Sequence, residues 1–157
     1  AHPPCKSWGK FAWRIREVSR RAHDCGPRAV AQVRAFGGVL EHPVGSGLWK
    51  HCDLPRPGAG RDAWGGFTVE VNQCDWGHPA RKPTLLYIVG LEGPSSLPPM
   101  PAPGTPTHCI VRRRNNAHSL PELPKKLRPI TPPAFAAFLA DIAKAAAVPT
   151  IKVETTI

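Results

Sequence analysis

The chain has 157 residues, of which 41% are apolar, so it can form one domain with a hydrophobic core. Its 21 Lys and Arg residues against 11 Asp and Glu residues give a formal net charge of +10, and such an excess attracts polyanions, of which nucleic acid is the commonest. No apolar run reaches the roughly 18 residues that a transmembrane helix needs, which excludes a membrane-spanning protein.

The five cysteines are odd in number and widely spaced, which is typical of a reduced, cytoplasmic protein rather than a disulfide scaffold. No pair has the Cys-x-x-Cys spacing of a zinc site. Cys74 lies near His78, but no second close pair of ligands accompanies them, so we expect no structural metal.

The first third of the chain predicts a helix that leads into a short buried strand. Apolar residues recur at helical spacing from about Gly26 to Phe36, and Gly37-Gly38 supplies a stop. Val39-Leu40 then predicts a strand. Together they would form half of a parallel strand-helix-strand crossover, whose first strand would end at Pro3-Pro4.

The middle of the chain predicts two further strands. Residues 44–52 have room for one or two helical turns. Segments 67–72 and 84–89 are rich in β-branched and aromatic residues, and a loop at 73–83 joins them. The second run is apolar enough throughout to be a central strand.

The last third combines an extended linker with one amphipathic helix. The Pro-rich segment 93–106 has no hydrophobic period, and 109–111 predicts a short edge strand. Apolar residues at 3-4 spacing predict a helix at 132–147 with Thr131 as its cap. The chain then divides into a sheet-bearing part, a Pro-rich and basic linker, the helix and a tail, at 1–92, 93–131, 132–147 and 148–157.

Three short motifs stand in an informative order: Pro3-Pro4-Cys5, Glu41-His42-Pro43 after an apolar run, and the basic segment 77–84 before a strand that ends in Gly90. In this order they resemble three motifs of the DNA cytosine-C5 methyltransferases. That family has its nucleophile in a Pro-Cys, its base-reading acid in a Glu-Asn-Val or Glu-Asn-Pro, and a basic segment before a strand ending in Gly. Some phage-type members carry a Lys-Pro-Thr like the one at 82–84. The resemblance covers about residues 1–90.

The resemblance implies a mixed α/β fold, a partial doubly wound Rossmann-like methyltransferase sheet with long Pro- and Gly-rich loops and a C-terminal helix, with 1–92 as the catalytic half. It makes Cys5 the nucleophile that attacks a flipped pyrimidine and Glu41 the residue that contacts the base. Both would leave neighbouring parallel strands at one sheet edge and face a common cleft. The remaining residues expected to contact DNA or substrate are Lys6, Ser7, Trp8, His42, Arg81, Lys82 and Thr84.

The sequence departs from the family at two of these motifs. His42 stands where the family mostly has Asn, and its titration near neutral pH would add a pH dependence that Asn lacks. The larger branch of the family has Gln-x-Arg-x-Arg in the third motif; here Ala80 and Lys82 stand nearest the first two positions, and Pro83-Thr84 replace the rest.

Each assignment has a simpler alternative. Cys5 is then an idle thiol in a strand-to-loop turn, and Glu41 pairs with one of the many arginines. Arg81 and Lys82 are solvated charges beside a hairpin, and Trp8 is a packing residue rather than a platform for a base.

The family binds its methyl donor, S-adenosylmethionine, through a glycine-bearing loop upstream of Pro-Cys. We therefore expect the chain to be the carboxyl-terminal part of a longer, phage-type protein, inactive by itself, in the cytoplasm of a bacterium or an infected host. Its substrate would be cytosine in DNA, with a related pyrimidine modification as a close alternative. The competing hypothesis is a DNA-binding accessory module that kept the sheet and the charge without the chemistry.

Overall fold

The computed structural model describes residues 7–8, 20–110 and 120–146. Its strands form one antiparallel sheet in the order β1-β3-β2. The strands are β1 (Gly38–Pro43), β2 (Phe67–Asn72) and β3 (Pro83–Val89). In register, Glu41 of β1 lies opposite Leu86 of β3, and Val71 of β2 lies opposite Thr84.

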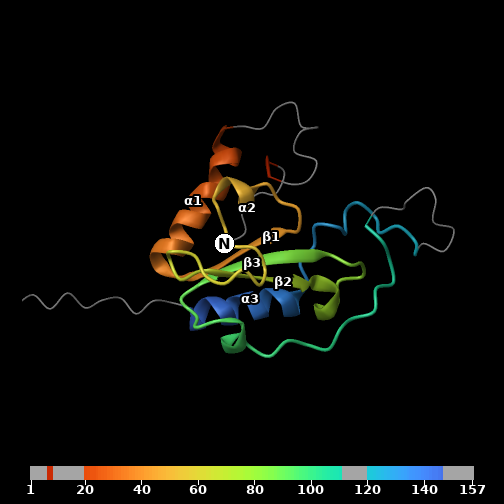
Figure 1. Ribbon diagram of the computed structural model, residues 1–157. Coiled ribbons are helices and arrows are strands. Elements are labelled where there is room, and N and C mark those ends of the chain that lie inside the picture. The colour runs from red at the N-terminus through yellow and green to blue at the C-terminus, as the bar shows by residue number, and fades with distance from the viewer. Residues whose placement is uncertain (1–6, 9–19, 111–119, 147–157) are drawn as a thin grey trace, which may run out of the picture.

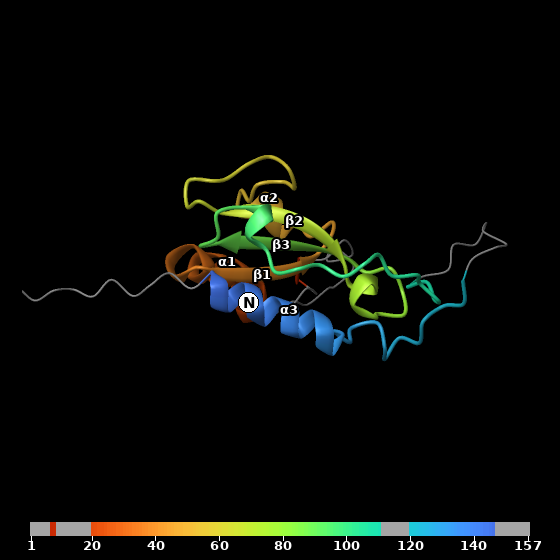
Figure 2. The same ribbon diagram turned by 90° about the horizontal axis from the view of Figure 1, so that it is seen from below.

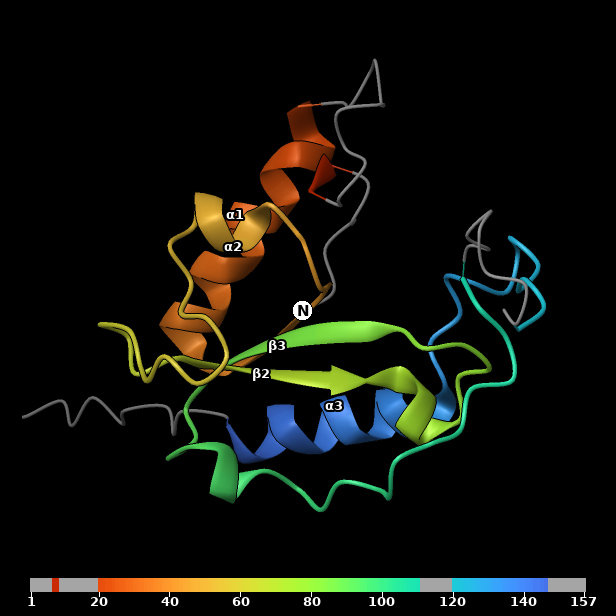
Figure 3. The ribbon, with the colours of Figure 1, turned by 45° about the vertical axis from the view of Figure 1, so that its right-hand side comes forward.

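Helices cover both faces of this sheet and give a mixed α/β fold with three layers (Figure 1). On one face lie α1 (Arg20–Phe36) and α2 (Leu48–His51), and on the other lies α3 (Pro133–Ala145). Figure 2 shows α3 running lengthwise beside the strands, and Figure 3 shows the sheet between α3 and the pair α1 and α2. Among the described helices, none is long and apolar enough to cross a membrane.

The central position of β3 confirms the prediction for 84–89. From Thr84 to Val89 every residue is buried, because helices cover both faces of the strand. Its side chains alternate between the two cores. Leu85 and Tyr87 pack towards α1 and α2, whereas Leu86 and Ile88 pack towards α3.

The parallel crossover predicted for the first third does not appear among the described strands. β1 pairs with β3, and this pairing is antiparallel, as is that of β2 with β3. A buried apolar run does not reveal strand direction, whereas the short connection between β2 and β3 permits only an antiparallel hairpin. The strand expected to end at Pro3-Pro4 lies outside the described residues.

Helix α1 ends as predicted but begins earlier. Gly37 follows its last residue with a φ of 74°, and its N–H donates to Val33 O at 2.9 Å, which closes the last turn. The predicted start near Gly26 is wrong, because α1 begins at Arg20 and contains Pro27. Proline removes the helical N–H that would bond His23 O, and Trp8 Nε1 donates to that carbonyl instead, at 3.0 Å.

Helix α3 lies close to its predicted range and buries the predicted face, with Phe135, Phe138 and Ile142 against the sheet. The predicted cap is wrong. Pro132 is the N-cap residue, with φ of −57° and ψ of 138°, and no side chain bonds the first turn. Proline disfavours helical geometry in the residue before it, so Pro133 keeps Pro132 extended and the helix begins one residue later than a cap at Thr131 requires.

The Pro-rich segment crosses the α3 side of the molecule, and a hydrogen bond from Gly104 fixes it to the short helix η3 (Gln73–Trp76). It contains one short 3₁₀ turn, η4 (Pro94–Ser96), and the N–H of Gly104 donates to Asp75 Oδ1 at 2.9 Å. The edge strand predicted at 109–111 is reduced to isolated bridges in the described part, from Ala80 to His108 and from Cys109 to Glu122. Residue 111 lies outside the described residues.

Candidate functional site

Glu41 lies inside β1, on the face that α3 covers. Val39 belongs to the core beneath α3, and residues two apart on a strand share a face. By the same alternation Thr84 lies on this face of β3, because Leu86 belongs to that core too. Glu41 is 3% exposed and Thr84 is fully buried. Two predicted site residues from distant motifs therefore come together.

Gln73 joins these two side chains. Its Nε2 donates to Glu41 Oε1 at 3.1 Å and to Thr84 Oγ1 at 3.1 Å. The Thr84 hydroxyl in turn donates to the backbone oxygen of Lys82 at 3.0 Å. We call Glu41, Gln73 and Thr84 the Gln73 network. Sequence reasoning missed Gln73; the only cue was a polar pair, Asn72-Gln73, directly after a strand.

The loop that carries Gln73 is closed by its neighbour Asn72. Asn72 Oδ1 accepts from Lys82 N at 2.9 Å and from Cys74 N at 3.2 Å, where it caps the short 3₁₀ helix η3 (Gln73–Trp76). The backbone of Gln73 is held as well, since its N–H donates to Lys82 O and its carbonyl accepts from His78 N. The third sequence motif is therefore fixed to the end of the β2–β3 hairpin.

Trp8 ties the segment after Cys5 to the other side of the sheet. Its carbonyl accepts from Gly47 N at 2.7 Å, in the loop that follows β1. The rings of His23 and His51 pack on its indole with centroids at 4.2 and 4.7 Å. Gly26 lets the indole approach α1, because a Cβ there would lie 2.6 Å from Trp8 Nε1.

The two predicted N-terminal site residues that the structure describes, Ser7 and Trp8, are buried. Trp8 is 7% exposed, so stacking on a base would require the indole to leave its partners, and its substrate role stays a prediction. Cys5 and Lys6 lie outside the described residues. Covalent geometry alone limits the Cα of Cys5 to within about 11 Å of the Cα of Trp8, at roughly 3.6 Å per residue.

The expectation that Glu41 emerges at the carboxyl end of its strand is wrong. β1 continues to Pro43, and the carboxylate of Glu41 is buried against Gln73. His42 is 1% exposed and alternates to the face that α1 and α2 cover. The apolar run Val39-Leu40 did not show where the strand ends. The strand continues through His42, which is polar but buried.

The two basic residues of the third motif differ in how far they are exposed to solvent. Arg81 is exposed and lines a cavity of about 470 Å³ together with Glu70, Asp75 and Trp76. Lys82 is half-buried, and its Nζ donates to the carbonyl of Ile130 at 3.3 Å. The DNA contact expected of Arg81 stays a prediction, whereas the Lys82 ammonium is engaged within the protein.

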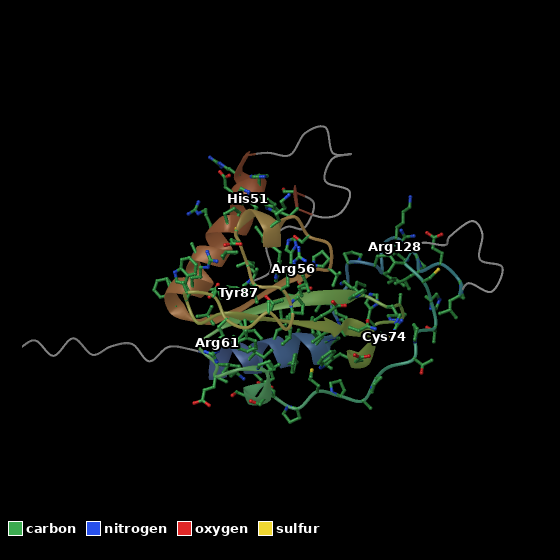
Figure 4. The ribbon with its side chains drawn as sticks, in the orientation of Figure 1. His51, Arg56, Arg61, Cys74, Tyr87 and Arg128 are labelled. Atoms are coloured by element: carbon green, nitrogen blue, oxygen red, sulfur yellow. The ribbon has the colours of Figure 1, made fainter. Side chains whose placement is uncertain are left out.

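A second polar cluster lies on the α1 face, and we call Arg34, Asp62 and Tyr87 the Asp62 network. The Tyr87 hydroxyl donates to Asp62 Oδ2 at 2.6 Å, and Arg34 Nη2 lies 3.4 Å from the same oxygen. In Figure 4, Tyr87 lies towards α1, whereas Cys74, the neighbour of Gln73, lies at the other end of the sheet.

Burial and hydrogen bonding shift the pKa values in this cluster. Burial and the bond to Asp62 raise the pKa of Tyr87 to about 12. Burial alone would raise the pKa of Asp62, but bonds from Tyr87 and from the N–H groups of Gly66 and Trp64, with the charge of Arg34, outweigh burial and lower it. Burial also raises the pKa of the Cys52 and Cys74 thiols, which keeps both protonated near neutral pH.

The described residues do not fit the methyl donor that the resemblance implies. The glycine turns at Gly58 and Gly60, with φ of 78° and 87°, lead into β2 and not into the N-terminus of a helix. Within the described ranges, no group of three or more His, Cys, Asp or Glu side chains is placed to hold a metal ion.

A cavity of about 570 Å³ opens beside the loop that follows β1. Its walls include Trp49 and Leu85, and its charged lining residues are Lys50, Asp53, Arg56 and Glu70. Its volume is sufficient for a nucleotide, but neither Glu41 nor Thr84 lines it. Comparison of the chain with protein-family models, with curated proteins and with solved structures finds no match.

Proposed function

We propose that the chain acts in a DNA-modifying enzyme of the cytosine-C5 methyltransferase type, in which Cys5 attacks the base and Glu41 binds it. One observation carries this proposal. Glu41 and Thr84, taken from two separate motifs of the resemblance, belong to one buried network joined by Gln73. Buried polar residues from distant segments require mutual hydrogen bonds, so their convergence is a specific arrangement.

The fold is compatible with this assignment. Doubly wound sheets often carry antiparallel strands at one edge of an otherwise parallel sheet, and β1-β3-β2 has the form of such an edge. The proposal requires the segment ending at Cys5 to lie near β1. Trp8 supports this, because it is bonded to Gly47 just beyond β1 and is three residues from Cys5.

The proposed chemistry begins with addition of a thiolate to the ring. Cys5 gives its proton to solvent, its sulfur forms a bond to carbon 6, and the electron pair of the 5,6 double bond moves to carbon 5. Without a methyl donor, carbon 5 takes a proton from water. Loss of the original hydrogen from carbon 5 as a proton then restores the double bond, breaks the carbon–sulfur bond and frees the thiolate. Glu41 stabilises the adduct through the polar edge of the base.

This reversible addition provides a test that needs no donor and no knowledge of the target sequence. The full-length protein is incubated with DNA that carries tritium at carbon 5 of every cytosine, and release of tritium to water is measured. We expect release by the wild type, none above background with Cys5→Ser, and a loss of about 100-fold or more with Glu41→Gln. Cys109→Ser is the matched thiol control. Release that survives Cys5→Ser would overturn the assignment.

The second candidate is the DNA-binding accessory module. It is favoured by the 3% exposure of Glu41 and by a nucleotide-sized cavity that Glu41 does not line. This candidate predicts DNA binding that weakens steeply with salt, through the +10 charge, in the absence of any tritium release. The same preparation thus distinguishes the two candidates.

A further inference from the structure

We infer that Gln73 is a positioning residue, which holds the carboxylate of Glu41 in the orientation that meets the base. The inference rests on the proposed function and assigns a role to a residue outside all three motifs. Gln73 is fully buried and donates from one nitrogen to both Glu41 Oε1 and Thr84 Oγ1. It therefore connects the base-binding acid to the loop of the third motif.

The direction of the hydrogen bonds fixes the orientation of the amide. The Thr84 hydroxyl uses its proton on Lys82 O, so Thr84 Oγ1 faces Gln73 as an acceptor. Glu41 Oε1 is an acceptor as well. Turning the amide over would bring its own carbonyl oxygen against these two oxygens, so only the orientation with nitrogen inward is stable. Thr84 thus fixes the orientation of the Gln73 amide, and the amide fixes the orientation of the Glu41 carboxylate.

The main chain of Gln73 gives the amide a rigid support. Its N–H donates to Lys82 O at 3.2 Å, and its carbonyl accepts from His78 N at 3.1 Å. A side chain that is buried and anchored at its own backbone loses little further freedom when it orients a neighbour. The amide also donates without adding a positive charge, so it orients the carboxylate without neutralising it. This arrangement preorganises Glu41 before the substrate arrives.

The test compares three variants of the full-length protein in the tritium-release assay. Gln73→Met keeps the volume but removes the donor, and we expect the release rate at saturating DNA to fall about 10- to 100-fold, while the Kd for DNA stays within about 2-fold. Thr68→Val is the matched control. Thr68 is buried, it accepts a bond from Trp49 Nε1 on the opposite face, and its replacement should leave the release rate within about 2-fold.

Gln73→Glu supplies a readout that mere loss of packing would not produce. At neutral pH the new carboxylate faces Glu41 Oε1 and repels it, so release should be slow. As the pH falls towards about 5, the new group takes a proton and its O–H can donate as the amide did. The ratio of its rate to the wild-type rate should therefore rise at least about 5-fold, whereas the ratio for Gln73→Met stays flat.

The outcomes separate this inference from the proposed function. Release by the wild type with an unchanged rate in Gln73→Met overturns the role of Gln73 and leaves the proposed function intact. Equal and pH-independent losses in Gln73→Met and Gln73→Glu also overturn it, because they indicate a packing role only. Absence of release by the wild type overturns both.

Discussion

The two faces of the sheet carry two different kinds of polar cluster. Towards α1, the Asp62 network contains a close ion pair, and the carboxylate of Asp62 accepts from Tyr87, from Arg34 and from two backbone N–H groups. Towards α3, the carboxylate of Glu41 is engaged by the neutral amide of Gln73. Both clusters reach the central strand β3, through Tyr87 and Thr84.

This difference indicates different tasks. Asp62 binds its own loop at Trp64 and Gly66 and fixes that loop to the sheet, which is what a stabilising cluster does. Gln73 instead connects two sequence motifs, because its amide donates to both Glu41 and Thr84. We therefore expect changes in the Asp62 network to affect stability, and changes in the Gln73 network to affect the reaction more than stability.

The largest expected effect on stability is that of Asp62→Ala. It removes the acceptor of four hydrogen-bond donors and leaves the guanidinium of Arg34, 15% exposed, without this carboxylate. The free energy of unfolding should fall by about 3 kcal/mol, and the Tm by roughly 6–12 °C in calorimetry. Asp141→Ala, on an exposed helical pair with Lys144, is the control and should change it by less than about 0.5 kcal/mol. A similar Tm for the two variants would contradict the comparison.

The next expected effect is a dependence of stability on alkaline pH, which the ionisation of Tyr87 reports. Tyr87 is the only tyrosine of the chain, so the ultraviolet absorbance of tyrosinate follows it directly. Its midpoint should lie at about 12 in the folded protein and move to 10.0 on unfolding. Because the folded pKa is the higher one, this stabilisation is complete below pH 10.0 and is lost as the pH rises towards about 12. A folded-state midpoint near 10 would show that Tyr87 is not held by Asp62.

The same network should give an acid dependence of opposite sign. The pKa of Asp62 is lowered on folding from 3.8, so its stabilisation is present above that pH and is lost as the pH falls through the folded value. The difference in unfolding free energy between the wild type and Asp62→Asn should therefore shrink below about pH 4. Urea titrations at several pH values measure it, and a difference that grows at low pH would reverse the assignment.

Of the two polar clusters, the Gln73 network should contribute less to stability, as Gln73→Met tests. Loss of one neutral donor to two buried oxygens should lower the unfolding free energy by about 1–2 kcal/mol. That is less than for Asp62→Ala, although the effect of Gln73→Met on tritium release is the larger of the two. Urea unfolding of both variants beside their release rates checks this reversal. The same rank order in both measurements would mean that the two clusters do not differ in task.

The elements that the sequence predicts well are those with a clear hydrophobic period. The face of α3 that contains Phe135 and Ile142, and the central strand at 84–89, follow from apolar spacing and burial alone. The end of α1 follows from Gly37, whose positive φ suits glycine. In each case the local sequence pattern agrees with the burial or the backbone angle that the folded structure requires at that place.

The missed features depend on contacts between distant residues. Pro27 is tolerated inside α1 because Trp8 occupies the carbonyl that proline leaves without its helical partner. Gln73 carries no periodic pattern, and its importance depends on Glu41 and Thr84. The direction of β1 depends on which neighbour it finds, and its buried residues do not encode that choice. The motif made Glu41 a candidate, but it did not predict that this side chain is buried.

The docking of Trp8 also has a consequence for local concentration. Three covalent links confine Cys5 to a sphere of about 11 Å radius around the Cα of Trp8, whose carbonyl is bonded to the loop after β1. One thiol in that volume corresponds to an effective concentration on the order of 0.3 M. Gly26, by admitting the indole to α1, helps to fix the anchor point from which this concentration is set.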